Sequence, residues 1–556
     1  MNYSDMPGKV NRKLNEKGTP YKGNDLLLEA GFIKPSGRGF ISYLPLGMRV
    51  LNNLKRIISE EMEKLGGMEV STPLISSESL WEVTGRNNTT SMEIARMTDR
   101  QGKTLILSPT HEEAVTNLIK DYIKSHKDLP LFVYQHQLKF RDEIRPRGYL
   151  IRSREFLMHD GYSFHRNFTE LNNFFPKIFA AYERILKRCS IPYVTSEADP
   201  GFMKGSRSYE FNLPHERGKN IIISCPGCGY TANRSIARFE KVNPSEALED
   251  MEEKTCEEGK GCKNKTRCKV FKGGKKFIMA LYRDDFSLST DKLKKIIGEE
   301  ELAPATEDEM RDLGINPDSI SPFNLCSSCL IVVDDSVADT PNLTLPSGAE
   351  GYCFANVNFG RDFDAHKIGD IVKAGNSDVC RICGTPLVGS RGIELAHIFK
   401  LDDYYSRHFG LTFQDEDNRV KTPFMGSYGI GLGRLLYGAA ESNRDEKGLL
   451  WPAELAPFRY FIMGIGKSPT VKEKVFGLGE KLAGQALVDD RKEGIGVKLR
   501  DCDMLGIPWR IIISNRYLET GEVELYKRED GSLNYIPYQD LLPTLHEWER
   551  QEGLRS

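Results

Sequence analysis

Two Cys-x-x-Cys pairs bracket the middle of this chain, at Cys225–Cys228 and at Cys380–Cys383. Of the twelve cysteines, Cys189 and Cys502 alone lie outside the segment that these pairs enclose. In a reducing cytosol such clusters indicate metal sites rather than disulfides. Because an inserted segment must leave and rejoin its core at neighbouring points, we expect the four thiolates to converge on one Zn²⁺. Reduced thiols without a metal are the alternative.

The chain of 556 residues is long enough for three or four domains. A strand–helix pattern runs up to the cysteine-rich block, resumes after it, and gives way at LLWPAELAPF to a tail that alternates helix and strand. In that tail KVFGLGEKLAGQAL reads as a helix, and RIIIS and EVELYKR read as strands. The predicted division is 1–219 for the first part of a core, 220–390 for an insertion, 391–455 for the rest of the core, and 456–556 for a C-terminal module.

Composition excludes several classes of protein. With 39% hydrophobic and 28% charged residues the chain is neither disordered, collagenous nor a coiled coil. No apolar run reaches the ~18 residues that span a bilayer, and the first residues lack the apolar core of a secretory signal. We therefore expect a cytoplasmic protein with no membrane partner. A net charge of −2 argues against a wholly basic nucleic-acid coat and leaves local basic faces open.

A charged hairpin is predicted over residues 131–165, where FRDEIRPRGYLIRSREF separates two strands. If both arms are strands, Arg141 and Glu143 share a face of their strand, as do Arg152, Arg154 and Phe156 of theirs. Planar guanidinium groups suit phosphate and carboxylate oxygens, and a phenylalanine ring can stack on a purine. The alternative is a surface hairpin with a ladder of ion pairs.

A glycine-rich segment, MGSYGIGLGRLL, follows much later in the chain. Alternate glycines allow a backbone to approach a ligand closely, and Arg434 would stand at the start of a helix. The dinucleotide-binding spacing GxGxxG in a strand-first context is absent. An amphipathic helix is also predicted near the N-terminus, from apolar residues at three- and four-residue spacing over Met48–Met62.

Taken together, these segments resemble the three motifs of class II aminoacyl-tRNA synthetases: the early helix ending near Pro73, the RxE…RxxxF hairpin, and GxGxGR. Further stretches, among them SPTHEEAV, RGIELAHIFKL and VDDRKEGIGVKLRDCDMLGIP, resemble bacterial-type prolyl-tRNA synthetases and follow that family's order from about residue 25 to 540. The resemblance implies an α/β (α+β) fold: an antiparallel-sheet catalytic core, an inserted α+β domain and a C-terminal α/β anticodon-binding domain. It also implies an ATP-dependent proline–tRNA ligase.

The resemblance assigns roles to individual residues of this chain. It implies ATP-binding residues Arg141, Glu143, Arg152, Phe156, Glu394 and Arg434, of which Arg141, Glu143 and Arg434 are catalytic. It implies proline-binding residues Thr110, Glu112, Arg141, His165 and Ser427. The resemblance also implies L-proline, ATP with Mg²⁺, and tRNA(Pro) as substrates, and implies that neither DNA nor a covalent enzyme intermediate is involved. His111, His159, His165 and His397 are expected to pack or hydrogen bond rather than act as bases.

In the family the insertion often hydrolyses mischarged alanyl-tRNA(Pro), since a proline pocket cannot exclude alanine by size. The matching positions here are Lys265, Asp334 and Cys353, the last in place of the family's histidine. Ligands for the first zinc are Cys225, Cys228, Cys380 and Cys383. A weaker second metal site would use Cys256, Cys262, Cys268, Cys326 and Cys329.

The C-terminal module resembles the family's anticodon-binding domain, which makes Arg491, Lys492 and Lys498 candidate tRNA contacts. The first motif implies a homodimer. Lys400, Asp402 and Asp403 depart from the family pattern near the expected amino-acid pocket. Alternative functions are therefore a paralogue that activates a proline analogue, a catalytically silent tRNA-binding regulator, and a zinc-rich nucleic-acid-binding protein that keeps the core as scaffold.

Overall fold

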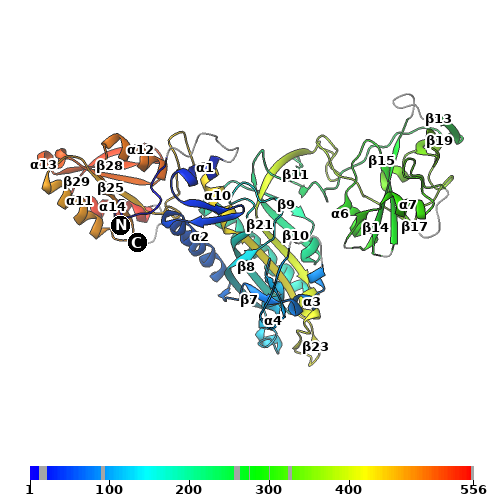
Figure 1. Cartoon of the computed structure of the whole chain (residues 1–556), viewed down its shortest axis with the longest axis horizontal. Coiled ribbons are helices and arrows are strands. Elements are labelled where there is room, and N and C mark those ends of the chain that lie inside the picture. Colours follow the sequence, from blue (N-terminus) through cyan, green and yellow to red (C-terminus); the bar gives the residue numbers. More distant parts are fainter. Residues whose placement is uncertain are drawn as a thin grey trace. The chain divides into compact units, whose positions relative to one another are not determined.

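The chain forms two compact units in the computed structural model, which describes residues 1–11, 22–88, 94–255, 263–274, 276–299, 301–323 and 329–551 (Figure 1). Unit 1 comprises Met1–Val194, Phe211–Leu213 and Ile393–Ser556; unit 2 comprises Thr195–Glu210 and Pro214–Gly392. The sequence-based division at residues 220 and 390 stays a prediction beside these bounds. Within the described part of the chain, no helix has both the length and the apolar character needed to cross a bilayer.

An antiparallel sheet forms the centre of unit 1. Strand β7 (Leu131–Phe140) pairs with β8 (Glu155–His165), β8 with β24 (Phe424–Gly431), and β24 with the second half of β21 (Val388–Asp402). The short strand β3 (Met68–Glu69) adds to β7 in parallel. These strands are the expected arms of the charged hairpin and the expected glycine-rich strand.

Three helices pack with this sheet: α2 (Pro45–Glu63), α5 (Phe168–Arg188) and α10 (Leu432–Ser442). Helix α2 buries Leu51, Leu54, Ile57 and Ile58, so the three- and four-residue spacing seen in the sequence is its packed face. The Asn167 side chain caps α5 by accepting a hydrogen bond from the Glu170 amide. The amphipathic helix predicted over Met48–Met62 is confirmed as part of α2.

Smaller elements surround the sheet of unit 1. They are α1 (Lys22–Glu29), β1 (Ile33–Gly37), β2 (Phe40–Tyr43), β4 (Ile75–Ser77), α3 (Glu78–Glu82), β5 (Ala95–Thr98), β6 (Thr104–Leu107), α4 (Glu112–Ile119), α9 (Tyr404–His408), β22 (Phe413–Gln414) and β23 (Val420–Lys421). Strands β4 and β5 flank β6 in an antiparallel sheet, and the chain passes from β6 into α4. This passage carries Thr110 and Glu112.

The C-terminal part of unit 1 is an α/β module. Its sheet has the order β26 (Ala486–Asp489), β25 (Tyr460–Gly464), β27 (Trp509–Ile513), β28 (Glu522–Lys527) and β29 (Leu533–Pro537). Its helices are α11 (Pro469–Lys481), α12 (Ile495–Leu505), α13 (Asn515–Thr520) and α14 (Leu541–Gln551). The helix expected over KVFGLGEKLAGQAL is wrong at its end, because the chain turns at Gly484 and Ala486 begins a buried strand.

Unit 2 is built on a five-stranded sheet in the order β16 (Ala303–Pro304), β14 (Thr266–Gly273), β15 (Lys276–Arg283), β17 (Cys329–Asp334) and β20 (Lys367–Gly369). Its helices are α6 (Thr290–Ile297), α7 (Glu307–Asp312) and α8 (Asp335–Ala338). A second sheet holds β13 (Glu252–Thr255), β19 (Tyr352–Val357) and β18 (Leu343–Pro346). At the root of the unit, β11 (Asn220–Ser224) pairs with β12 (Thr231–Asn233) and with the first half of β21; β9 (Val194–Ala198) and β10 (Arg207–Pro214) lie beyond β12.

Candidate active site

The charged hairpin carries its arginines in a loop rather than on its strands. Strand β7 ends at Phe140 and β8 begins at Glu155, so Arg141, Glu143 and Arg152 lie between them. The expectation that strand alternation places these side chains on shared faces is therefore wrong. The Glu143 amide donates to the Arg141 carbonyl at 2.7 Å, a tight turn that strand geometry does not permit. Phe156 does lie on β8 as expected.

Arg141 stands over the Phe156 ring, with 5.2 Å between the guanidinium carbon and the ring centroid. Its Nε donates to the Pro109 carbonyl at 3.3 Å, which ties the hairpin to the segment that precedes α4. Burial and the nearby Arg434 lower the pKa of Arg141. Two arginines held close together define a place where negative charge is favourable.

Glu143 and Arg152 form an ion pair in this structure. Glu143 is 8% exposed, and its carboxylate also accepts a hydrogen bond from the Arg145 amide at 3.2 Å. The structure thus brings together two of the residues expected to bind ATP.

Arg434 lies in the first turn of helix α10, which begins directly after the glycine-rich strand, as the sequence predicts. Its Nη1 lies 3.4 Å from a Glu394 carboxylate oxygen, and its Nε donates to the Ile151 carbonyl at 3.0 Å. Burial acts to raise the pKa of Glu394, but His397, Arg434 and Arg141 together lower it to about 2. Glu394 therefore stays ionised, which is the state that a Mg²⁺ ligand needs.

One glycine of this strand is required by the protein's own packing. A Cβ atom at Gly426 would lie 2.0 Å from the Tyr428 hydroxyl oxygen and 3.0 Å from Ser163 Oγ. At Gly429 the nearest atom would be Met158 Cε at 3.2 Å. Close packing within the sheet therefore accounts for Gly426, whereas the contact at Gly429 is with the end of a flexible side chain.

Glu112 is held at the start of α4 by two hydroxyl groups. Thr110 Oγ1 donates to one of its carboxylate oxygens at 2.5 Å, and Ser427 Oγ donates to the other at 2.9 Å. Glu112 is 1% exposed. Three of the residues predicted to bind proline therefore converge on one buried carboxylate, although Ser427 is more than three hundred residues away in sequence.

Arg86 completes this cluster and was not anticipated from the sequence. Its Nη1 lies 2.9 Å from Glu113 and 3.7 Å from Glu112, and all three side chains are buried. Burial acts against its charge, but Glu113 and Glu112 hold the pKa of Arg86 above its usual range. Arg86 lies in a short 3₁₀ turn with no periodic pattern, so no local signal distinguishes it from a surface arginine.

His165 is not brought to this cluster. Its Nε2 lies 2.9 Å from Ser163 Oγ and its ring packs on Phe174 of α5, with 5.1 Å between centroids. Ser427 pairs with Tyr162, three residues before His165, and side chains at that spacing point to opposite faces of a strand. Burial lowers the pKa of His165 to about 4, which makes it a neutral packed histidine.

The other conspicuous polar side chains near the sheet are also packed. Lys139 is fully buried and lies 2.5 Å from His111 Nδ1 and 2.6 Å from Asp160 Oδ1. His159 is fully buried, and its ring nitrogens have no hydrogen-bond partner among the described residues. Lys400 donates to Asn172 of α5 at 2.6 Å. The departure from the family pattern at Lys400 is thus directed toward α5.

The four cysteines at the root of unit 2 gather at one point. Their sulfur atoms all lie within 4.8 Å of one another. The Cys225–Cys383 separation is 3.4 Å and the Cys228–Cys380 separation is 3.7 Å. Four thiolates about 2.3 Å from a tetrahedral Zn²⁺ stand about 3.8 Å apart, whereas a disulfide would need about 2.05 Å. The donor set and its spacing fit zinc.

The residues predicted to edit mischarged tRNA have different environments. Lys265 is exposed, Cys353 is buried, and Asp334 is fully buried. Asp334 accepts hydrogen bonds from the Ser336 and Ile371 amides and lies 2.9 Å from Lys241 Nζ. Of the proposed second metal site, Cys256, Cys262 and Cys326 lie outside the described residues.

The candidate anticodon contacts also differ in their exposure and in their partners. Arg491 is paired with Asp489 at 2.7 Å and with Asp501 at 2.8 Å, and it stacks on Tyr3. Lys498 is buried and donates to the Asp489 carbonyl at 2.9 Å. Lys492 is exposed.

Comparisons with known proteins agree with this geometry. Residues 93–443 match the family described as tRNA synthetase class II core domain (G, H, P, S and T), and residues 461–548 match the Anticodon binding domain. The proline–tRNA ligase of Dehalococcoides mccartyi (strain CBDB1) is 37% identical over 98% of this chain and 98% of its own length. That of Salinispora tropica is 35% identical over 94% of this chain and 92% of its own length.

A solved structure with the same fold is the prolyl-tRNA synthetase of Cryptosporidium parvum complexed with halofuginone and AMPPNP. It matches with a TM-score of 0.57 and 14% identity, over 98% of this chain and 80% of that one. The sheet, the hairpin and the glycine-rich strand define a class II aminoacyl-tRNA synthetase core. An anticodon-binding domain follows it in the chain. Within that class, the chain belongs to the proline–tRNA ligase family.

Proposed function

We propose that this chain activates L-proline with ATP and transfers it to the 3′ end of tRNA(Pro). The observation that carries the proposal is the buried cluster in which one arginine, Arg86, faces two carboxyl groups, Glu112 and Glu113; with both carboxyls ionised, the formal charges sum to −1. Free proline is a zwitterion with a secondary ammonium and a carboxylate. The ammonium would neutralise the cluster beside Glu112, and the carboxylate would face the Arg141 guanidinium.

The reaction needs positioning and charge neutralisation rather than an enzyme nucleophile. A proline carboxylate oxygen attacks the α-phosphorus in line, and the bond from that phosphorus to the pyrophosphate oxygen breaks. The guanidinium groups of Arg141 and Arg434 would stabilise the negative charge that develops in the transition state. Phe156 and Glu143 would hold the adenine, and Arg152 the phosphate tail. Glu394 would help to hold Mg²⁺, which neutralises phosphate charge when bound.

Proline-dependent exchange of pyrophosphate into ATP tests the proposal. Exchange should depend on proline, and a panel of other amino acids and proline analogues should give at most a small fraction of its rate. Exchange that no amino acid stimulates would support the alternative of a silent tRNA-binding protein. Preference for an analogue would support a paralogue of different specificity.

We also propose a structural Zn²⁺ on Cys225, Cys228, Cys380 and Cys383. The spacing of the sulfur atoms supports it, and the two pairs come from opposite ends of the inserted unit. A closed tetrahedral thiolate site has no open position for chemistry, so the metal would brace the root of unit 2.

Editing, a homodimer and a cytoplasmic location stay predictions. Deacylation of alanyl-tRNA(Pro) by the wild-type chain and by Lys265→Ala would test the first, since activity at background in the wild type refutes it. Sedimentation at micromolar concentration would test the second. The assignment of Lys492 as the accessible anticodon contact predicts weaker tRNA binding in Lys492→Gln.

A further inference from the structure

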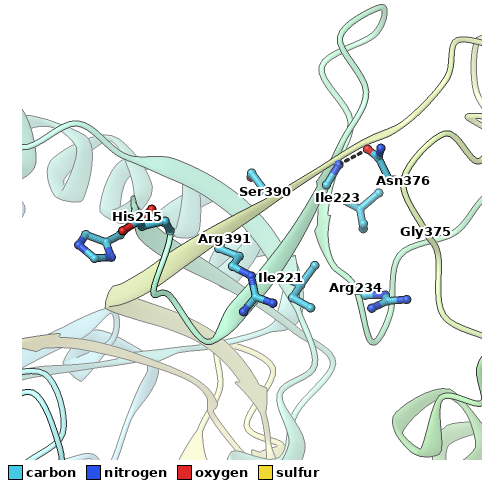
Figure 2. A pocket seen from close by; sticks show the side chains of 10 residues that line it. His215, Ile221, Ile223, Arg234, Gly375, Asn376, Ser390 and Arg391 are labelled. Carbon is cyan, nitrogen blue, oxygen red and sulfur yellow. Dashed lines mark hydrogen bonds between the residues drawn. The ribbon is translucent and has the colours of Figure 1, made fainter. Parts of the chain in front are cut away.

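A pocket of about 690 Å³ opens in unit 2, and none of the residues assigned above lines it (Figure 2). Its floor is the face of β11 that carries Ile221 and Ile223. Arg391 and Arg234 lie to either side of Ile221, and Asn376 stands near Ile223 (Figure 2). The pocket therefore combines an apolar base with two cationic groups.

The two arginines are held by backbone carbonyls and not by acids. Arg391 Nη1 donates to the Gly218 carbonyl at 3.3 Å, and Arg234 Nε donates to the Ala374 carbonyl at 2.9 Å. Neither forms an ion pair with a carboxylate of the described residues. Glu216, the acidic residue that lines the pocket, lies 3.9 Å from Arg217. Each guanidinium thus keeps donors in a fixed position for an anionic ligand.

A glycine lies beside the floor, since Gly389 pairs with Ile223 across the two strands. The Gly389 amide donates to Asn376 Oδ1 at 3.1 Å, which fixes the orientation of that side-chain amide. The NH₂ group of Asn376 can then donate to a base edge or a sugar hydroxyl.

We propose that this pocket binds a nucleotide of the single-stranded 3′ end of tRNA, with phosphates on Arg234 and Arg391 and a base or ribose on the isoleucine floor. The inference rests on the proposed function, which supplies tRNA as the substrate. A concave pocket with an apolar base admits an unpaired nucleotide, whereas a duplex presents its backbone to a flat or convex surface.

The experiment compares two RNAs on the full chain: intact tRNA(Pro), and the same tRNA without its four 3′-terminal nucleotides. The test variant is Arg234→Gln/Arg391→Gln. The matched control is Arg311→Gln, an exposed arginine of α7 in the same unit. Arg391→Lys keeps the charge, and thermal unfolding of each variant checks that it folds.

For intact tRNA we expect the double variant to bind about 10-fold more weakly and to lose about 1.4 from the slope of log affinity against log salt, at ~0.7 per single-strand phosphate. Truncated tRNA should bind wild type and double variant alike. For intact tRNA, Arg391→Lys should bind nearly as tightly as wild type, and Arg311→Gln should match wild type. Equal losses for both RNAs would overturn the inference, as would no loss for intact tRNA. Failure of the proposed function would appear separately, as absence of proline-dependent exchange in the wild-type chain.

Discussion

Replacing Glu112 with glutamine removes one charge from the Arg86–Glu112–Glu113 cluster and keeps the size of the side chain. Arg86 retains Glu113 at 2.9 Å, so no buried cation is left unpaired and the fold should persist. The cluster then sums to zero instead of −1. The substrate ammonium loses the charge that would attract it, while the ATP-binding arginines are untouched.

The size of the effect follows from the separation of the charges. Two unit charges at about 4 Å attract by about 4 kcal/mol at an effective dielectric constant near 20, a factor of about 1000 in binding. Because the glutamine amide still accepts one hydrogen bond, we expect Glu112→Gln to lower kcat/KM for proline by about 30- to 1000-fold. Ser427→Ala keeps the charge and removes one hydrogen bond of 2.9 Å, so about 10-fold is the largest loss expected.

Proline-dependent pyrophosphate exchange measures both variants, with proline and ATP titrated separately. The KM for ATP should stay within about threefold of wild type. A Glu112→Gln enzyme whose kcat/KM for proline is within threefold of wild type would refute the electrostatic argument. Equal changes for ATP and proline would refute the assignment of Glu112 to the amino acid.

Three further outcomes are expected. Purified protein should carry about one zinc per chain, and Cys380→Ser should lose that metal together with thermal stability; substantially less than one zinc in the wild type would contradict the site. Arg434→Gln should lower kcat by about 100-fold or more, with pyrophosphate exchange as the assay and a loss below tenfold as the contrary result. Burial lowers the pKa of His136 to about 4 from an unfolded value of 6.5, so the folded chain binds fewer protons and stability falls as pH drops through that window. In urea titrations His136→Gln should reduce this dependence by about 1.4 kcal/mol per pH unit, and an unchanged slope would contradict a buried neutral histidine.

Local patterns in the sequence predict the elements that present the site. The apolar spacing from Leu51 to Met62 becomes the buried face of α2, whereas Met48 is exposed, and the strand arms of the charged hairpin become β7 and β8. The helix after the glycine-rich strand begins where it was expected, with Arg434 in its first turn. In each case a signal within about twenty residues suffices, because hydrophobic period and glycine placement act locally.

Contacts made by distant parts of the chain were harder to anticipate. Strand alternation predicted the wrong faces for Arg141 and Arg152. Both residues lie in the loop between β7 and β8, where backbone hydrogen bonds within the loop replace strand pairing. Arg86 has no sequence pattern at all, since its role depends on two glutamates that tertiary folding places beside it. The end of the α11 prediction failed because burial in the sheet overrode the helix propensity of Ala486 and Leu487.

The sequence predicts that Cys225, Cys228, Cys380 and Cys383 lie close together, because an inserted segment must leave and rejoin its core at neighbouring points. The charge cluster at Glu112 was only partly predictable from the sequence. The resemblance pointed to Thr110, Glu112 and Ser427, and the geometry added the arginine and the second carboxylate that set the net charge of the pocket.

Charging of tRNA tests the central claim most directly. The full chain should attach radiolabelled proline, in an ATP-dependent reaction, to tRNA that carries the proline anticodon, and should reach a stable plateau. Glu112→Gln should reduce the initial rate by the factor seen in pyrophosphate exchange. Failure to form prolyl-tRNA with an enzyme that is folded and metal-loaded would contradict the account.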